Sequence, residues 1–180
     1  MTLTLYKHSL RSQFAAALDM LEDCVRKCPD AAWGEPIAKY PFWMVVYHTL
    51  CYTDLYLAPS NRAWKPDKGK RGGPPGLHPK GKQELAEEYP SREFAREELL
   101  RYIEIVRGRL DEALGRETGK SLAGSSGFSW IEPARADTYL YNLRHLCHHV
   151  GQLSAFLHKR QISARWVKFH VEPPKAAKLE

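Results

Sequence analysis

Residues 144–153 read Arg-His-Leu-Cys-His-His-Val-Gly-Gln-Leu, and this stretch is the most informative part of the chain. It lies in an apolar pattern that predicts a helix from about Ala134 to Lys159. Because a helix turns by about 100° per residue, His145 and His149 share one side of it, beside the core-facing arc. His148 points the other way and is predicted to be a surface residue. The two inward imidazoles can therefore reach a single metal ion.

A second predicted helix, from about Tyr40 to Leu57, supplies a third histidine, His48. Pro41 would occupy its first turn, where the missing N–H is harmless. The helix is apolar on nearly every side, which predicts burial all round. Its outer face would be covered by the following connection or by another subunit. His48 alone would be interpreted as a hydrogen-bonded core residue, but beside an inward pair of histidines it is the predicted third metal ligand.

The remaining pattern predicts two more long helices and an all-α fold. The first helix runs from about Thr4 to Lys27, and its inner face repeats every three or four residues. The other runs from about Ser91, a suitable N-cap, to Leu114, with Glu93 near its positive end and Gly115 as a stop. The inner face of the first helix is expected to comprise Phe14, Leu18, Leu21 and Val25.

The segments between these helices differ greatly in length. Residues 58–90 form a long connection rich in proline and glycine, so the helices on either side of it need not be neighbours. Residues 115–133 are predicted to form a second loop. We expect one helical domain over residues 1–160 and a tail over residues 161–180. In that tail Trp166, Val167 and Phe169 would pack on the bundle before a frayed end.

Three imidazoles suit a divalent transition metal, with zinc or nickel favoured and iron or cobalt as further candidates. They leave at least one coordination position open, as in catalytic zinc sites. Alternatively, Cys51 would close the site as a fourth ligand. Asn142 and Gln152 are the expected hydrogen-bond partners of the ligands, and Tyr52 is a candidate acid or base. Asp54 faces away from His48 and is interpreted as a structural or interface residue.

Composition narrows the class of protein. The chain is 43% hydrophobic and 27% charged, as expected of a globular domain. It has no apolar run of the roughly 18 residues that a membrane helix needs. Its N-terminus lacks the features of a signal peptide, which favours the cytoplasm. The four cysteines fall in helical segments and are interpreted as reduced thiols.

The net charge of +6 raises the hypothesis of nucleic-acid binding. Much of the excess lies between Arg62 and Lys82, where Trp64 and His78 are the only rings that could stack on bases. Binding of this kind would weaken steeply with salt. A solvated basic loop is the interpretation that we favour.

His48 in Val-Val-Tyr-His-Thr-Leu-Cys-Tyr-Thr-Asp-Leu, together with the motif at residues 144–153, resembles the DinB-like superfamily of metal-binding four-helix bundles. The resemblance extends from the first helix to about Arg160. It implies an up-down-down-up bundle with a long crossover between the second and third helices, and a metal triad of His48, His145 and His149. It also implies a homodimer, and a thiol-dependent transferase or isomerase that uses bacillithiol, mycothiol or glutathione.

Four functions therefore remain open on the sequence. The first is a metal-dependent enzyme that transfers a low-molecular-weight thiol to a small-molecule electrophile. The second is a metal-binding or stress-response module without catalysis, its site closed by Cys51. The third is nucleic-acid binding through the 62–82 loop, and the fourth is a helical protein whose histidines bind no metal.

Overall fold

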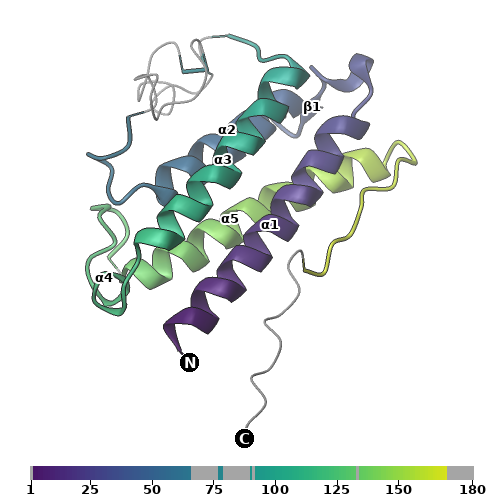
Figure 1. The fold of residues 1–180 in the computed structure, drawn as a ribbon. Coiled ribbons are helices and arrows are strands. Elements are labelled where there is room, and N and C mark those ends of the chain that lie inside the picture. The colour runs from purple at the N-terminus through teal and green to yellow at the C-terminus, as the bar shows by residue number, and fades with distance from the viewer. Residues whose placement is uncertain (1, 66–76, 79–89, 91, 133, 170–180) are drawn as a thin grey trace, which may run out of the picture.

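The computed structural model describes residues 2–65, 77–78, 90, 92–132 and 134–169. The chain is mostly helical, which confirms the all-α class. Four long helices lie side by side in Figure 1: α1 (Leu3–Lys27), α2 (Phe42–Leu57), α3 (Arg96–Arg116) and α5 (Arg135–His158). Helix α1 packs against α3 and α5, and so does α2. No helix in the described part of the chain is both long and apolar enough to cross a membrane.

Helix α1 ends close to its predicted position, and all four of its predicted core residues are fully buried. The side-chain oxygen of Thr2 accepts a hydrogen bond from the N–H of Leu5 and caps the helix. The 3₁₀ turn η1 (Asp30–Ala32) and the two-stranded antiparallel hairpin of β1 (Pro36–Ile37) and β2 (Tyr40–Pro41) connect it to α2.

The hairpin corrects the predicted start of α2. Tyr40 and Pro41 are extended and pair with β1, so Pro41 is the residue before the helix and does not lie in its first turn. The predicted burial of α2 is confirmed: of its sixteen residues only His48 and Tyr52 are partly exposed. Buried residues of the following connection contact α2: the indole of Trp64 donates to Asp54, and Nδ1 of His78 lies 2.8 Å from the hydroxyl of Tyr47.

The burial of α2 also encloses a charged side chain, that of Asp54, which is 1% exposed. Its Oδ2 accepts hydrogen bonds from Trp64 Nε1 at 3.0 Å and from the hydroxyl of Tyr102 at 3.1 Å, and it forms an ion pair with Arg109. A buried carboxylate is costly unless it is paired in this way. Asp54 therefore ties α2 to α3 and to the connection, in agreement with its predicted structural role.

Helix α3 begins later than predicted. Its first residue is Arg96, and the predicted cap, Ser91, lies outside the described residues. The carboxylate of Glu98 accepts a hydrogen bond from the N–H of Ala95 at 2.9 Å and is held by Arg92 at 2.7 Å. This local clamp sets the start of the helix, and Glu98, not Glu93, lies near its positive end. The helix continues to Arg116, past the predicted stop at Gly115.

The predicted loop over residues 115–133 contains a short helix that the sequence interpretation missed, α4 (Gly119–Ala123). Thr118 and Ser121 cap it reciprocally through their hydroxyls. Further along, Gly127 has a φ of +82°, and a Cβ at this position would overlap the backbone of Pro59 and Ser60. The loop after α4 is therefore held closely against the start of the long connection.

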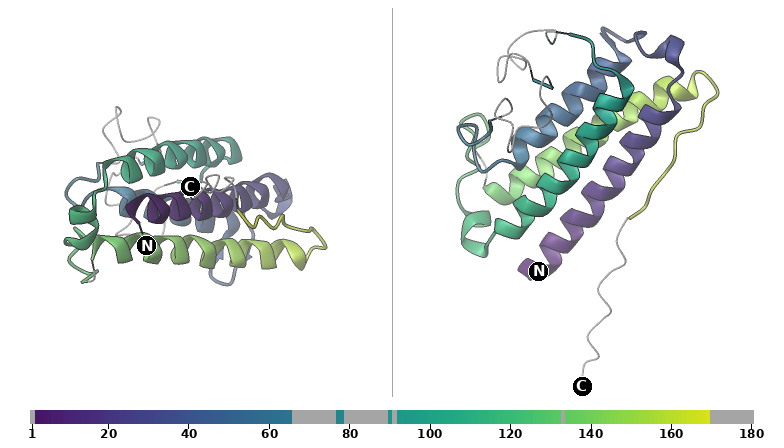
Figure 2. Two further views of the ribbon diagram at one scale, coloured as in Figure 1. Left: turned by 60° about the horizontal axis from the view of Figure 1, so that its bottom comes forward. Right: turned by 45° about the horizontal axis from the view of Figure 1, so that its top comes forward.

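The segment after α5 turns back and runs alongside α1, as Figure 2 shows. Backbone groups of this segment hydrogen bond to α1: the N–H of Arg165 donates to Asp23 at 2.7 Å, and Lys27 donates to the carbonyl of Ser163 at 2.9 Å. Ile162 and Ala164 pack against the core. The prediction that Trp166, Val167 and Phe169 pack on the bundle is wrong for the two aromatic residues, because Trp166 is 75% exposed and Phe169 is 58% exposed, whereas Val167 is half-buried. Residues 170–180 lie outside the described residues.

The prediction for this fold concerns Gly127. Replacing it with alanine puts a Cβ into the backbone of the Pro59 turn at a positive φ, and we expect the free energy of unfolding to fall by about 3 kcal/mol. Gly108→Ala is the matched control: it lies on the exposed face of α3 with nothing near the new Cβ. This control should stabilise the protein by about 1 kcal/mol. Urea unfolding of both variants measures the difference, and equal stabilities would contradict the prediction.

Candidate metal centre

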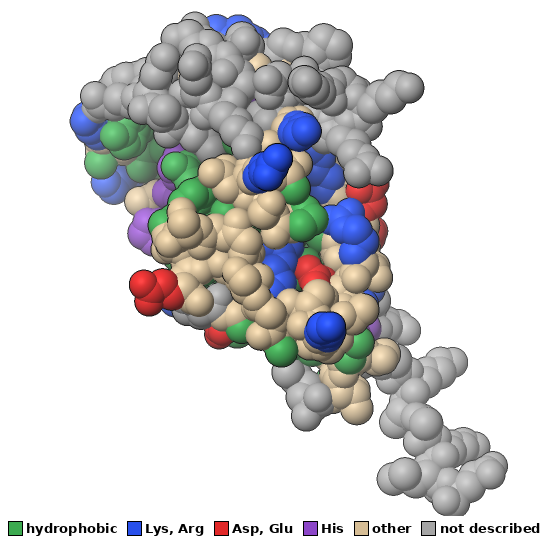
Figure 3. All heavy atoms as spheres, turned by 90° about the vertical axis from the view of Figure 1, so that its left-hand side faces the viewer, with side chains coloured by type: hydrophobic (Ala, Val, Ile, Leu, Met, Phe, Trp, Pro, Cys, Tyr) green, Lys and Arg blue, Asp and Glu red, His purple; other side chains and the backbone are tan. Residues whose placement is uncertain are grey.

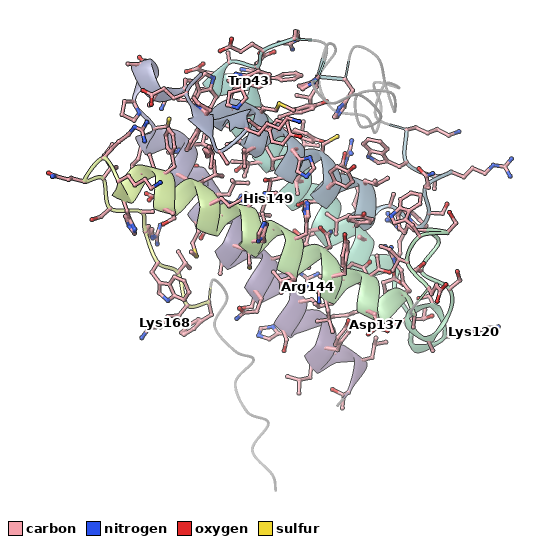
Figure 4. All side chains as sticks on the ribbon, turned by 180° about the vertical axis from the view of Figure 1, so that it is seen from behind. Trp43, Lys120, Asp137, Arg144, His149 and Lys168 are labelled. Carbon is pink, nitrogen blue, oxygen red and sulfur yellow. The ribbon has the colours of Figure 1, made fainter. Side chains whose placement is uncertain are left out.

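Helix α5 places His145 and His149 one turn apart on its side next to α2. Their ring centroids are 4.5 Å apart, and their Nε2 atoms are 3.1 Å apart. Both side chains are partly buried, while His148 between them is exposed, as predicted. Figure 4 shows His149 near the middle of the length of α5. The helical spacing thus brings the predicted pair together.

Helix α2 supplies the third ring from the opposite side. The Nε2 of His48 is 3.3 Å from the Nε2 of His145, and its ring centroid is 4.9 Å from that of His149. One nitrogen from each of the three rings lies within 4.8 Å of the other two. Among the histidine, cysteine and carboxylate side chains of the described residues, His48, His145 and His149 form the group that can hold a metal ion.

Two of the three nitrogen–nitrogen separations in the triad fit a bound metal. With a metal–nitrogen distance of about 2.0–2.1 Å and tetrahedral angles, two imidazole ligands lie roughly 3.3–3.4 Å apart. The two measured separations, 3.1 and 3.3 Å, are close to that value. Hydrogen bonds between the rings account for the arrangement less well, because a neutral imidazole has one N–H and one lone pair. A single N–H on Nε2 of His145 can donate a full hydrogen bond to only one of its two neighbours, His48 or His149.

The rings are held in the uncharged form that a metal requires. Burial, with a smaller contribution from the nearby His149, lowers the pKa of His48 to about 4. Burial, with the neighbouring histidines, lowers the pKa of His145 to about 3. The pKa of His149 is also lowered, chiefly by burial. All three imidazoles are therefore neutral near pH 7.

Gln152 is a hydrogen-bond partner of the triad, as predicted. Its Oε1 lies 2.8 Å from Nδ1 of His149. A carbonyl oxygen at this position favours the proton on Nδ1 and leaves the lone pair of Nε2 directed at the other two rings. The equivalent nitrogen of His145, Nδ1, is buried and has no hydrogen-bond partner in the described part of the chain.

The predicted role of Asn142 is wrong. This side chain is fully buried and donates a hydrogen bond to the carbonyl of Thr53 at 3.0 Å. Asn142 therefore links α5 to α2 and does not hydrogen bond to an imidazole of the triad. The reason is its angular position on α5, which lies closer to the core than that of Gln152.

The two other predicted residues of the site occupy different sides of α2. The ring of Tyr52 lies 4.6 Å from that of His48 and 5.5 Å from that of His145, so Tyr52 borders the triad. Burial raises the pKa of Tyr52, and its hydroxyl keeps its proton at neutral pH. Cys51 is fully buried with its Sγ 3.9 Å from Nδ1 of His78, away from the triad. Among the described residues, Cys51 therefore does not close the site.

The sequence interpretation missed an aromatic row that leads away from the triad. The ring of Tyr56 lies 6.0 Å from that of Tyr52 and 5.3 Å from that of Tyr141. The indole N–H of Trp130, in the predicted second loop, donates to the hydroxyl of Tyr56 at 3.2 Å. The spacing of Tyr141, one turn before His145, was a usable signal, but nothing in the sequence places Trp130 beside it.

Most of residues 62–82 lie outside the described residues. On the face shown in Figure 3, lysine and arginine side chains lie beside acidic side chains as well as neutral atoms. The four cysteines form no disulfide, in agreement with the prediction of reduced thiols.

Comparison with known families places the chain in one of them. The sequence model of the DinB superfamily matches residues 13–153, which include all three histidines. The chain therefore belongs to the DinB superfamily. No curated protein and no solved structure matches the chain.

The lowered pKa values predict how the metal-free protein responds to acid. Below the unfolded-state pKa of 6.5, the unfolded chain binds protons that His48 and His145 cannot take up until the pH approaches about 4 and about 3. The free energy of unfolding should therefore fall as the pH drops through this window. Urea unfolding at about pH 7 and about pH 5 tests this. His48→Gln should show a smaller pH difference than the wild type, and an unchanged difference would contradict the assignment.

Gln152 should affect metal binding through His149. Gln152→Ala removes the acceptor that orients the ring, and we expect affinity for zinc to fall about tenfold. His148→Ala, an exposed neighbour, is the control and should bind zinc as tightly as the wild type. Competition with a chromophoric chelator measures both affinities. Equal affinity for the two variants would show that the hydrogen bond to His149 does not orient the ligand.

Proposed function

We propose that this member of the DinB superfamily binds one divalent transition metal ion through His48, His145 and His149, and uses it to transfer a low-molecular-weight thiol to an electrophilic substrate. The observation that carries the proposal is the convergence of three neutral Nε2 atoms at metal-binding distances. Membership of the superfamily supports it.

The ligand set favours zinc or nickel, with iron or cobalt as alternatives, because neutral imidazoles suit these ions. Only three protein ligands converge within the part of the chain that the structure describes. A closed structural site normally has four protein ligands, whereas catalytic sites have three and leave a position for a small molecule. The open position is therefore available to a thiol sulfur.

When bound, such a metal lowers the pKa of a coordinated thiol and makes it a thiolate at neutral pH. The sulfur then forms a bond to the electrophilic carbon of the substrate, and the leaving group departs with the electron pair. The thiol proton passes to solvent, since the exposed side chain of Gln152 borders the site. Tyr52 keeps its own proton, so its role in this scheme is to donate a hydrogen bond.

We also propose that the four long helices form an up-down-down-up bundle with the crossover between α2 and α3. The contacts of α1 with α3 and α5, and of α2 with the same two helices, support this arrangement. In such a bundle α2 and α5 are neighbours, as the triad requires.

Metal content is the first test. Wild-type protein prepared without a histidine tag should carry about one metal ion per chain by plasma mass spectrometry, and His149→Ala should lose it, because a ligand is removed. His148→Ala is the matched control on the same helix and should retain the metal. Wild-type protein that binds no zinc, nickel, iron or cobalt would contradict the proposal.

A second measurement separates a thiol-transfer site from a metal site without catalysis. Adding glutathione to the cobalt-loaded protein should produce a new sulfur-to-cobalt charge-transfer absorption, because the open position admits a thiolate. Consumption of the thiol with a model electrophile should follow and should be lost in His149→Ala. Unchanged cobalt absorption with glutathione, bacillithiol and mycothiol would argue for metal binding without thiol transfer.

A further inference from the structure

Helix α5 carries three buried polar atoms that make no hydrogen bond to any described residue. They are the hydroxyl oxygen of Thr138, the amide oxygen of Asn142 and Nδ1 of His145. Thr138 and Asn142 are fully buried, and His145 is half-buried. Buried polar groups in folded proteins are nearly always hydrogen-bonded, to protein or to ordered water. Three exceptions on one helix therefore need an explanation.

The three residues form a polar row along one side of α5. Each is four or three residues from the next, which places their Cβ atoms about 5–6 Å apart on the same side of a helix. Side chains of a helix lean toward its N-terminus, so that of His145 leans toward Asn142. Figure 4 shows the stretch of α5 that carries the polar row, between the labels of Asp137 and His149. The polar row begins at the triad and continues toward the start of α5.

The groups at the first step of the polar row are complementary. The amide of Asn142 is fixed in orientation, because its Nδ2 donates to the carbonyl of Thr53 at 3.0 Å and leaves the oxygen as an acceptor. The Nε2 of His145 faces the other two rings of the triad. If that nitrogen is to hold a metal ion, Nδ1 carries the proton and is a donor. One neighbour therefore offers a donor and the other an acceptor.

Water can complete these groups, since they make no direct hydrogen bond to one another. A water molecule between His145 and Asn142 accepts from Nδ1–H and donates to the amide oxygen. A second water molecule joins that oxygen to the hydroxyl of Thr138, which both donates and accepts. Buried water typically lies where it satisfies two to four polar groups that have no other partner.

Helix α2 contributes further buried hydroxyl groups. Thr49 and Thr53 are fully buried, and their hydroxyls donate to the carbonyls one turn earlier at 2.6 and 2.7 Å. A hydroxyl that donates in this way can still accept a hydrogen bond. Because Asn142 reaches the backbone of Thr53, the interface of α2 and α5 at this level contains enough polar atoms to hold water.

We propose that ordered water molecules connect Thr138, Asn142 and His145, and that Asn142 acts through them as a positioning residue for His145. The water keeps the proton on Nδ1 of His145 and leaves the lone pair of Nε2 for the metal. Gln152 does the same for His149 by direct contact. The part that this plays in metal binding rests on the proposed function. The water and the position of the proton do not.

A change at Thr138 that keeps its shape tests for the water. Thr138→Val removes only the hydroxyl. If that hydroxyl bonds to water, the variant leaves the water short of a partner, and the urea midpoint of unfolding should fall. If the hydroxyl has no partner at all, its removal should raise the midpoint, because an unpaired buried polar group is costly. An unchanged or raised midpoint would therefore overturn the proposal. Thr4→Val, at an exposed helical position, is the matched control and should leave the midpoint unchanged.

The position of the proton is read from the imidazole nitrogens of His145 by ¹⁵N NMR of the metal-free protein. The wild type should carry the proton on Nδ1. Asn142→Leu removes the acceptor, so the proton should move to Nε2 in a measurable fraction of molecules, and affinity for zinc should fall about tenfold. Thr138→Ser keeps the hydroxyl and should match the wild type in both measurements. A proton on Nε2 in the wild type would overturn the proposal, even if Asn142→Leu does not fold.

A crystal structure of the metal-free protein locates the water directly. We expect a water molecule within hydrogen-bond distance of both Nδ1 of His145 and the amide oxygen of Asn142, and its absence would overturn the proposal. If the wild type has this water but binds no metal, the proposed function fails and the water-linked polar row remains. If the wild type binds zinc and Asn142→Leu binds it equally tightly, the positioning role of Asn142 fails and the proposed function remains.

Discussion

Nearly every side chain of α2 is buried, and the rest of the structure depends on covering this helix. Helices α3 and α5 pack against it, and buried residues of the long connection contact it. The helix carries one carboxylate, Asp54, which is buried and must be paired. Arg109 and the hydroxyl and indole groups of Tyr102 and Trp64 supply that pairing. The pairing of Asp54 therefore holds the start of the connection, at Trp64, against α2.

The same burial prepares His48 for its proposed role. A histidine inside such a helix loses hydration, so its charged form is disfavoured and its lone pair is available at neutral pH. Helix α5 brings two more neutral imidazoles to the same point, and Gln152 orients one of them. With the proton on Nδ1 of all three rings, three Nε2 lone pairs would face one another, and a cation between them would relieve their repulsion. The packing of the helices therefore sets both the positions of the three imidazoles and their neutral protonation state.

The sequence predicted the helical class, the inward histidines and the exposed His148, because all three depend on periodicity within one helix. It failed where a particular strand pair or side-chain contact decides the outcome and helical periodicity does not. The extended pair at Pro41 requires a partner strand, and the start of α3 depends on the clamp between Arg92 and Glu98. Asn142 and Gln152 were treated alike because both lie on the same side of α5. Only the packing of α2 against α5 separates them.

His48 and His145 lie 97 positions apart in the chain. A cation shared between them closes a loop of that length, and it favours the folded chain by mass action as well. Newly made chains that acquire the ion would therefore survive proteolysis longer than chains that do not. The abundance of this protein in a cell would then follow the supply of its metal, even with synthesis held constant.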